Sequence, residues 1–165
     1  MEKIIIYTDG GSRGNPGPAG MGIVVADKKG KIMKEYSGFL GVKTNNEAEY
    51  EAVIFGLRKI KALLGKEKIK DCEFEVRMDS ELVARQLGGV YKIENEKLAP
   101  LFLKIWNLKM DFGKIYFKHI PREQNKEADR LANEAMDNES SKIKPASPPA
   151  CPVGRAGRYQ KSKLF

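Results

Sequence analysis

A short unbroken apolar run near the start of the chain constrains the fold more than any other feature. Ile4 to Thr8 contains no charge, which is typical of a strand buried on both faces of a sheet that helices cover. Asp9 follows at once, and the next eleven residues, GGSRGNPGPAG, hold five glycines and two prolines. This segment fits a turn. It also fits a carboxylate at a strand end, beside a backbone bare enough for a bulky anion to approach.

The hydrophobic pattern predicts further elements. Strands are expected at 22–26 and 32–40, as an antiparallel hairpin, and at 72–78 and 115–120. Helices are expected from Asn46, where Thr44 and Glu47 form a capping box, from the N-cap Ser80 to Leu87, over 98–108, and from near Asn125. The order β-β-β-α-β-α-α-β-α predicts an α/β fold with a five-stranded mixed sheet and helices on both faces. The first, fourth and fifth strands are expected to be parallel, and the second and third to form an antiparallel edge.

Length and charge favour one folded domain followed by a basic tail. The 165 residues suit a single core over residues 1–137, and residues 138–165 hold four prolines and no hydrophobic period, which predicts a flexible tail. The net charge is +8, but residues 1–137 hold 24 basic and 21 acidic residues, so charge alone is weak evidence for a nucleic-acid partner. Two cysteines predict neither a disulfide framework nor a thiolate metal site. The absence of a signal peptide or a membrane-length apolar segment predicts a soluble cytoplasmic protein without a membrane partner, with monomer as the default state.

Four acidic residues stand where side chains from different elements are expected to converge. Asp9 and Asp79 end two of the predicted parallel strands, and Glu49 and Asp129 lie in the first turns of two helices. Taken singly, each has an ordinary interpretation as a turn residue, a cap or an acid near a helix N-terminus. Ligands of open α/β sheets bind at the carboxyl ends of parallel strands, and carboxylates gathered there repel one another unless divalent cations neutralise them. Because hard oxygen ligands select Mg²⁺ or Mn²⁺, the four acids together predict a metal site.

Four motifs resemble those of the type 1 ribonucleases H, over about residues 3–137. They are TDGGSRGNPGPAG from Thr8, TNNEAEY from Thr44, MDSELV from Met78 and HIPREQNKEADRLA from His119. The resemblance places the family's metal-binding D-E-D-D quartet on Asp9, Glu49, Asp79 and Asp129, with Asp9 as the bridging ligand. Glu47 is then left as the capping-box partner. It also implies a ribonuclease H catalytic domain at residues 1–137.

The chemistry that the resemblance implies is hydrolysis of the RNA strand of an RNA·DNA hybrid, leaving 5′-phosphate and 3′-hydroxyl ends. It implies two Mg²⁺ ions per site, with Mn²⁺ as a substitute. His119, ten residues before Asp129, matches a catalytic histidine that assists proton transfer and product release, although an ordinary structural imidazole is the alternative. Glu123 is a weaker candidate for the same role. Residues 120–123, Ile-Pro-Arg-Glu, replace a loop that carries glycine and histidine in well-studied bacterial members.

Residues that would read the substrate belong to the same motifs. The candidates are Gly11, Ser12, Arg13, Asn15, Thr44, Asn45 and Asn46. The three asparagines match family positions in the minor groove, where the 2′-hydroxyl distinguishes RNA from DNA, and two of them also suit helix capping. The backbone of residues 11–13 is expected to approach the substrate closely because side chains there are few or small. Thr44 resembles a residue of the family's phosphate-binding pocket.

The stretch between Ser80 and Leu98 lacks the basic handle that some members carry. The chain therefore resembles archaeal-type and similar bacterial enzymes most closely, and double-stranded RNA, which some of these are thought to cleave, is a second candidate partner. The basic tail would supply part of the missing phosphate attraction, and an unstructured terminus without a role in binding is the alternative. Two alternatives stay open: a nucleic-acid-binding module without turnover, and another nuclease of the superfamily, of integrase, resolvase or exonuclease type.

Overall fold

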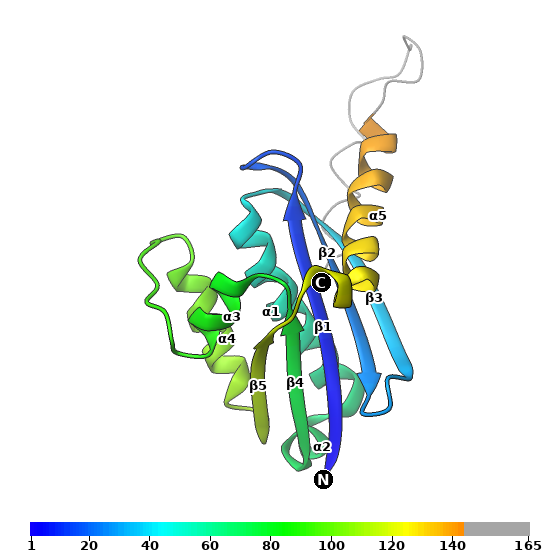
Figure 1. The fold of residues 1–165 in the computed structure, drawn as a ribbon, viewed down its shortest axis with the longest axis vertical. Helices are drawn as coiled ribbons and strands as arrows, with labels where there is room; N and C mark the ends of the chain where they lie inside the picture. Colours follow the sequence, from blue (N-terminus) through cyan, green and yellow to red (C-terminus); the bar gives the residue numbers. More distant parts are fainter. Residues whose placement is uncertain (144–165) are drawn as a thin grey trace.

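The computed structural model describes residues 1–143, which form one five-stranded sheet flanked by helices (Figure 1). The strands are β1 (Glu2–Ser12), β2 (Gly17–Asp27), β3 (Ile32–Lys43), β4 (Cys72–Met78) and β5 (Lys114–His119). Their order across the sheet is β3-β2-β1-β4-β5. Strands β1, β4 and β5 are parallel, whereas β2 and β3 continue the sheet antiparallel on the other side of β1. The predicted α/β fold is confirmed.

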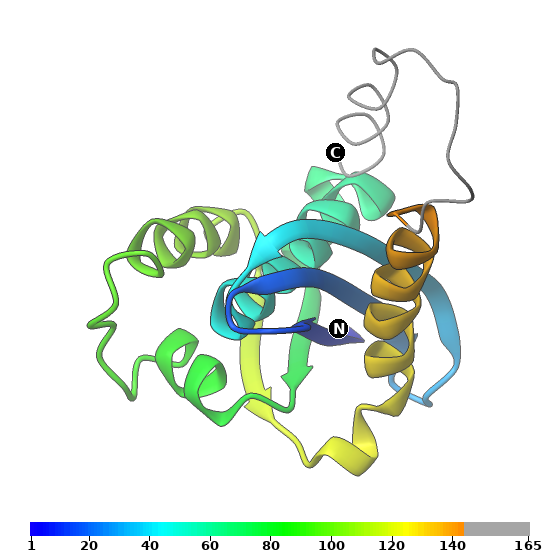
Figure 2. The same cartoon turned by 90° about the horizontal axis from the view of Figure 1, so that it is seen from above.

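Helices cover both faces of the sheet (Figure 2). They are α1 (Asn45–Leu64), α2 (Lys66–Asp71), α3 (Glu81–Leu87), α4 (Ala99–Lys109) and α5 (Lys126–Ile143), with a 3₁₀ turn η1 (Arg122–Gln124) before α5. The main core lies between the sheet and α1, where Ile6 and Ile23 are buried. A smaller cluster of Val24, Ala128 and Leu131 packs α5 against the opposite face.

The predicted capping box starts α1. The Thr44 hydroxyl accepts a hydrogen bond from the Glu47 amide at 3.2 Å, and the Glu47 carboxylate accepts one from the Thr44 amide at 3.1 Å. Because Glu47 is engaged in this cap, Glu49 is the acid of this motif that remains to face the sheet.

Strand β1 is longer than the apolar run predicts. Gly10 to Ser12 continue it by antiparallel pairing with β2, so the turn is confined to residues 13–16, and Asp9 lies inside the strand instead of closing it. The parallel pairing with β4 ends earlier, at Tyr7 opposite Arg77. Asp9 therefore stands just beyond the paired part of the parallel sheet, as expected for a ligand at its carboxyl edge.

Two further differences concern helices. The six-residue helix α2, which buries Ile69, has no counterpart in the sequence prediction. Helix α5 continues to Ile143, beyond residue 138 where the tail is expected to start, and the rest of that tail lies outside the described residues. Within residues 1–143, none of the helices combines the length and apolarity that crossing a membrane requires.

Candidate active site

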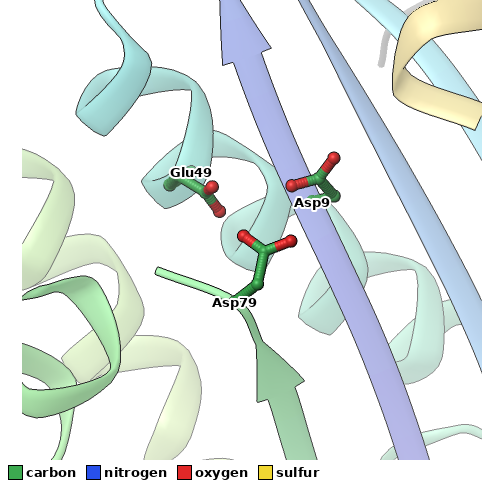
Figure 3. Close-up of side chains that lie close together, drawn as sticks. All are labelled: Asp9, Glu49 and Asp79. Atoms are coloured by element: carbon green, nitrogen blue, oxygen red, sulfur yellow. The ribbon is translucent and has the colours of Figure 1, made fainter. Parts of the chain in front are cut away.

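The four predicted acids line one cavity of about 470 Å³. Asp9, Glu49 and Asp79 each bring a carboxylate oxygen within 4.8 Å of the others, and Figure 3 shows these carboxylates converging from β1, α1 and the end of β4. Asp129 lines the same cavity from the first turn of α5. The structure thus brings together four acids that are far apart in the sequence.

Two glycines allow the helices that carry Glu49 and Asp129 to approach the sheet closely. A Cβ atom on Gly10 would lie 2.2 Å from the carbonyl oxygen of Ala48, so only glycine lets α1 approach β1 this closely and bring the next residue, Glu49, beside Asp9. On the other face, a Cβ atom on Gly22 would lie 2.0 Å from the carbonyl oxygen of Ala128, the residue before Asp129. Gly22 is the pairing partner of Asp9 on β2. A glycine that faces a helix backbone therefore brings Glu49 on one side of the sheet, and Asp129 on the other, close to Asp9.

Burial and repulsion by neighbouring carboxylates raise the pKa values of Asp9 and Glu49. Asp9 and Glu49 are each 7% exposed. Burial, followed by the charge of Asp79 and contact with Asp129, raises the pKa of Asp9 to about 8. Burial also raises the pKa of Glu49 well above its usual value, with the charges of Asp9 and Asp79 adding to the effect. Without a bound cation, these two groups favour their protonated forms.

The donor set fits hard divalent cations. It consists of carboxylate oxygens alone, and Glu49 Oε2 is buried with no hydrogen-bond partner among residues 1–143. An unpartnered buried carboxylate oxygen is costly unless a ligand satisfies it. Oxygen ligands of this kind suit Mg²⁺ and Mn²⁺, so Asp9, Glu49, Asp79 and Asp129 are the residues that could hold a metal.

The predicted substrate-binding residues form a rim on one side of the carboxylates. Gly11, Ser12, Arg13, Asn45 and Asn46 line the cavity. Asn45 Oδ1 accepts hydrogen bonds from the amide and hydroxyl of Ser12, at 2.9 and 3.1 Å. These hydrogen bonds tie the start of α1 to the end of β1.

Two predicted substrate residues do not line the cavity. Asn15 Oδ1 accepts a hydrogen bond from the Asn45 amide at 3.0 Å, so Asn15 supports a lining residue from behind. Thr44 is occupied as the N-cap of α1. Arg13 does line the cavity, and its guanidinium forms a 2.5 Å ion pair with Asp137 on α5.

Comparison with known proteins agrees with this arrangement. A family model described as reverse transcriptase-like matches residues 7–135. The chain is 42% identical over 137 residues to the bifunctional protein Rv2228c of Mycobacterium tuberculosis, covering 82% of this chain and 36% of that protein. It is 39% identical over 136 residues to ribonuclease HI of Halobacterium salinarum, covering 82% of this chain and 65% of that protein. The chain thus spans about a third of the mycobacterial relative and less than two thirds of the halobacterial one.

A solved structure decides the family. LC11-RNase H1, isolated from compost, is 52% identical, with a TM-score of 0.80, and the match covers 85% of this chain and 99% of that one. The chain belongs to the type 1 ribonuclease H family. LC11-RNase H1 has also been solved in complex with an RNA/DNA hybrid, and that structure matches at 51% identity and a TM-score of 0.79, over 83% of this chain and 99% of that one.

In this ribonuclease H family member, His119 does not line the cavity. It is exposed on β5, where it pairs with Met78. His119 is the last residue of β5, and its partner on β4, Met78, is the residue before Asp79. Glu123 lies on the wall of a neighbouring cavity of about 290 Å³.

Two basic residues that the motif analysis missed do line the ribonuclease H cavity. Arg122 comes from η1 and Lys126 from the start of α5. The charge of Arg122 opposes the rise in pKa of both Asp9 and Glu49, as expected for a cation in the same cavity. Both residues lie inside HIPREQNKEADRLA. The sequence feature that could have predicted them is a pair of basic residues between His119 and Asp129.

Proposed function

We propose that this chain is an endonuclease that hydrolyses the RNA strand of RNA·DNA hybrids and leaves 5′-phosphate and 3′-hydroxyl ends. The observation that carries the proposal is the convergence of the four acids in one cavity of a chain that belongs to the ribonuclease H family. The hybrid complex of LC11-RNase H1 supports the same substrate class.

In this proposal Asp9, Glu49, Asp79 and Asp129 hold two divalent metal ions, Mg²⁺ by preference and Mn²⁺ as a substitute. When bound, the ions lower the pKa of the attacking water and stabilise the leaving 3′-oxygen. Asp9 would be the ligand that the ions share, because its carboxylate interacts with those of Glu49, Asp79 and Asp129. The buried Glu49 would hold a metal through the carboxylate oxygen that has no partner among residues 1–143.

The rim formed by residues 11–13 and by Asn45 and Asn46 would bind the hybrid. Asn45 has its Oδ1 occupied by Ser12, which leaves its Nδ2 to donate to acceptors on the substrate. Recognition of a 2′-hydroxyl requires such polar groups at a wide minor groove. Asn15 would act indirectly, because its side chain accepts a hydrogen bond from the backbone amide of Asn45. Thr44 caps the start of α1, and we also assign it to the pocket that binds a phosphate of the substrate.

Two basic residues would help to bind the substrate next to the four acids. Arg122 and Lys126 line the cavity and would attract the scissile phosphate. His119 stays the sequence-based candidate for proton transfer and product release, and Glu123 is the weaker candidate for the same role. Neither is among the residues that line the cavity of the four acids, whereas Arg122 is.

The remaining features of the proposal concern the whole protein. We place a monomer in the cytoplasm, with the RNA·DNA hybrid as main partner, double-stranded RNA as a second candidate, and the basic segment from residue 138 as a separate contributor to phosphate binding. The catalytic domain is residues 1–137.

The test is cleavage of a hybrid labelled on its RNA strand, with Mg²⁺, Mn²⁺ or EDTA, beside matched RNA·RNA and DNA·DNA duplexes. Metal-dependent cutting of the hybrid's RNA is the expected result. Binding of the hybrid by folded protein without any cutting would instead make the chain a binding module. Cutting of the DNA·DNA duplex would favour another nuclease type.

A further inference from the structure

A buried amide lies directly behind the cluster of acids. The Asn125 side chain is 1% exposed, between the end of η1 and the start of α5. Its Nδ2 donates to the carbonyl oxygen of Thr8 at 2.9 Å and to Asp79 Oδ2 at 3.3 Å. Asn125 does not line the cavity of the four acids, so it lies out of reach of a substrate bound there.

The chemistry of the two partners identifies the end of the amide that faces them. A backbone carbonyl and a carboxylate only accept hydrogen bonds, so the NH₂ group of Asn125 must point toward them, one N–H to each. The amide oxygen is buried with no partner among residues 1–143. The side chain is therefore held in place through its two donors.

The same residue connects the elements that carry the acids. Thr8 precedes Asp9 on β1, and Asp79 follows β4. The carbonyl oxygen of Asn125 accepts a hydrogen bond from the amide of Asp129 at 3.1 Å, which starts α5 one turn before that acid. One side chain and its own backbone thus fix three of the four acids relative to one another.

We propose that Asn125 is a positioning residue that fixes the Asp79 carboxylate for metal binding. The proposal rests on the proposed function, because it assigns Asp79 as a metal ligand. The hydrogen bond to Oδ2 restricts rotation of the carboxylate and leaves the other oxygen to face the cavity, and the bond to Thr8 anchors the amide to the strand that carries Asp9. Partners behind a ligand that orient it in this way are typically worth about 10- to 100-fold in metal affinity.

Gln86 provides a matched control for this amide. It is 5% exposed and also makes two side-chain hydrogen bonds, accepting from the Tyr50 hydroxyl at 2.7 Å and donating to the Lys92 carbonyl at 3.2 Å. Neither partner is one of the four acids. Q86A therefore removes an amide that is similarly buried and similarly hydrogen-bonded, but that makes no hydrogen bond to the four acids.

The experiment is calorimetric titration of Mn²⁺ into wild type, N125A and Q86A, with hybrid cleavage measured in parallel. We expect the Kd for Mn²⁺ to rise about 10- to 100-fold in N125A and to stay near the wild-type value in Q86A. We also expect kcat to fall in N125A with little change in KM, because Asn125 does not line the substrate cavity. Unchanged Mn²⁺ affinity in folded N125A would overturn the proposal.

A measurement on the wild type covers the case in which N125A does not fold. The side-chain NH₂ signals of Asn125 should exchange slowly with solvent and shift on addition of Mg²⁺, while those of Gln86 should not shift. An Asn125 signal that Mg²⁺ leaves unchanged would also overturn the proposal. Wild type that binds Mn²⁺ through an Asn125-dependent site but never cuts a hybrid would refute the proposed function alone.

Discussion

Gly10 on β1 and Ala48 on α1 meet with no room for a side chain between them, since a Cβ atom on Gly10 would lie 2.2 Å from the Ala48 carbonyl oxygen. The next residue along the helix is Glu49. A methyl group at position 10 would therefore push α1 away from β1 and carry Glu49 away from Asp9.

We expect G10A to lower both stability and turnover. Overpacking of this kind costs about 1–3 kcal/mol, and displacement of Glu49 should weaken metal binding further. Chemical denaturation and Mn²⁺ titration measure the two effects. G11A is the control for stability, because nothing lies within 4 Å of a Cβ atom there. Equal stability of G10A and G11A would contradict this account of the packing.

D9N should abolish hybrid cleavage while leaving the fold intact. The substitution preserves the shape of the side chain but removes the charge of the ligand that we place between the metals. Cleavage assays with Mg²⁺ and Mn²⁺, beside circular dichroism spectra, measure the two properties. A purified variant that cuts at near the wild-type rate would remove Asp9 from the proposed mechanism.

The metal-free protein should lose stability relative to D9N as the pH rises. Burial and then the charge of Asp79 raise the pKa of Asp9 from 3.8 to about 8, so the folded state favours the protonated form. The stabilisation from this group is complete below pH 3.8 and is lost as the pH rises through 8. Thermal unfolding of both proteins in EDTA across this range tests the effect. Parallel profiles would show that Asp9 is not desolvated as described.

R122A should reduce turnover more than H119A, because Arg122 lines the cavity and His119 does not. Loss of a charged donor aimed at a reacting phosphate should cost on the order of 10²-fold in kcat. Steady-state kinetics of the two variants on one hybrid substrate make the comparison. An H119A defect as large as that of R122A would support the sequence-based role of His119 instead.

Removal of residues 144–165 should weaken hybrid binding at low salt and make the affinity less dependent on salt. This segment holds five Lys or Arg and no acid, and each phosphate contact that is lost reduces the salt slope by about one. The truncation leaves α5 complete. Filter binding over a range of salt concentrations measures the slope, and an unchanged slope would remove the tail from substrate binding.

Local pattern was enough to predict the elements that carry the acids. Alternation in CEFEVRM located the strand before Asp79, and the capping box at Thr44 located the start of the helix that carries Glu49. The extension of β1 to Ser12 was not predictable in this way. Glycine-rich sequence reads as a turn, and it becomes strand here because β2 supplies pairing partners.

The positions of Arg122 and Asn125 were also beyond sequence reasoning. Both belong to the irregular segment around η1, where no hydrophobic period relates a residue to a face. The burial of Asn125 follows from its hydrogen bonds to Thr8 and Asp79, which come from distant parts of the chain. His119 is exposed at the end of β5 and is not among the residues that line the cavity, so its catalytic role stays a prediction.

The number of strands that pair with β1 changes next to Asp9. Up to Tyr7 it is paired on both sides, and from Asp9 onward it keeps only its β2 neighbour. The backbone of Asp9 is therefore held by its pairing with Gly22 on β2, and its side chain takes no part in that pairing. A variant without the Asp9 carboxylate should keep this strand pairing and, on the proposed function, should still bind the hybrid without cutting it. Such a variant is a starting point for a reagent that detects RNA·DNA hybrids.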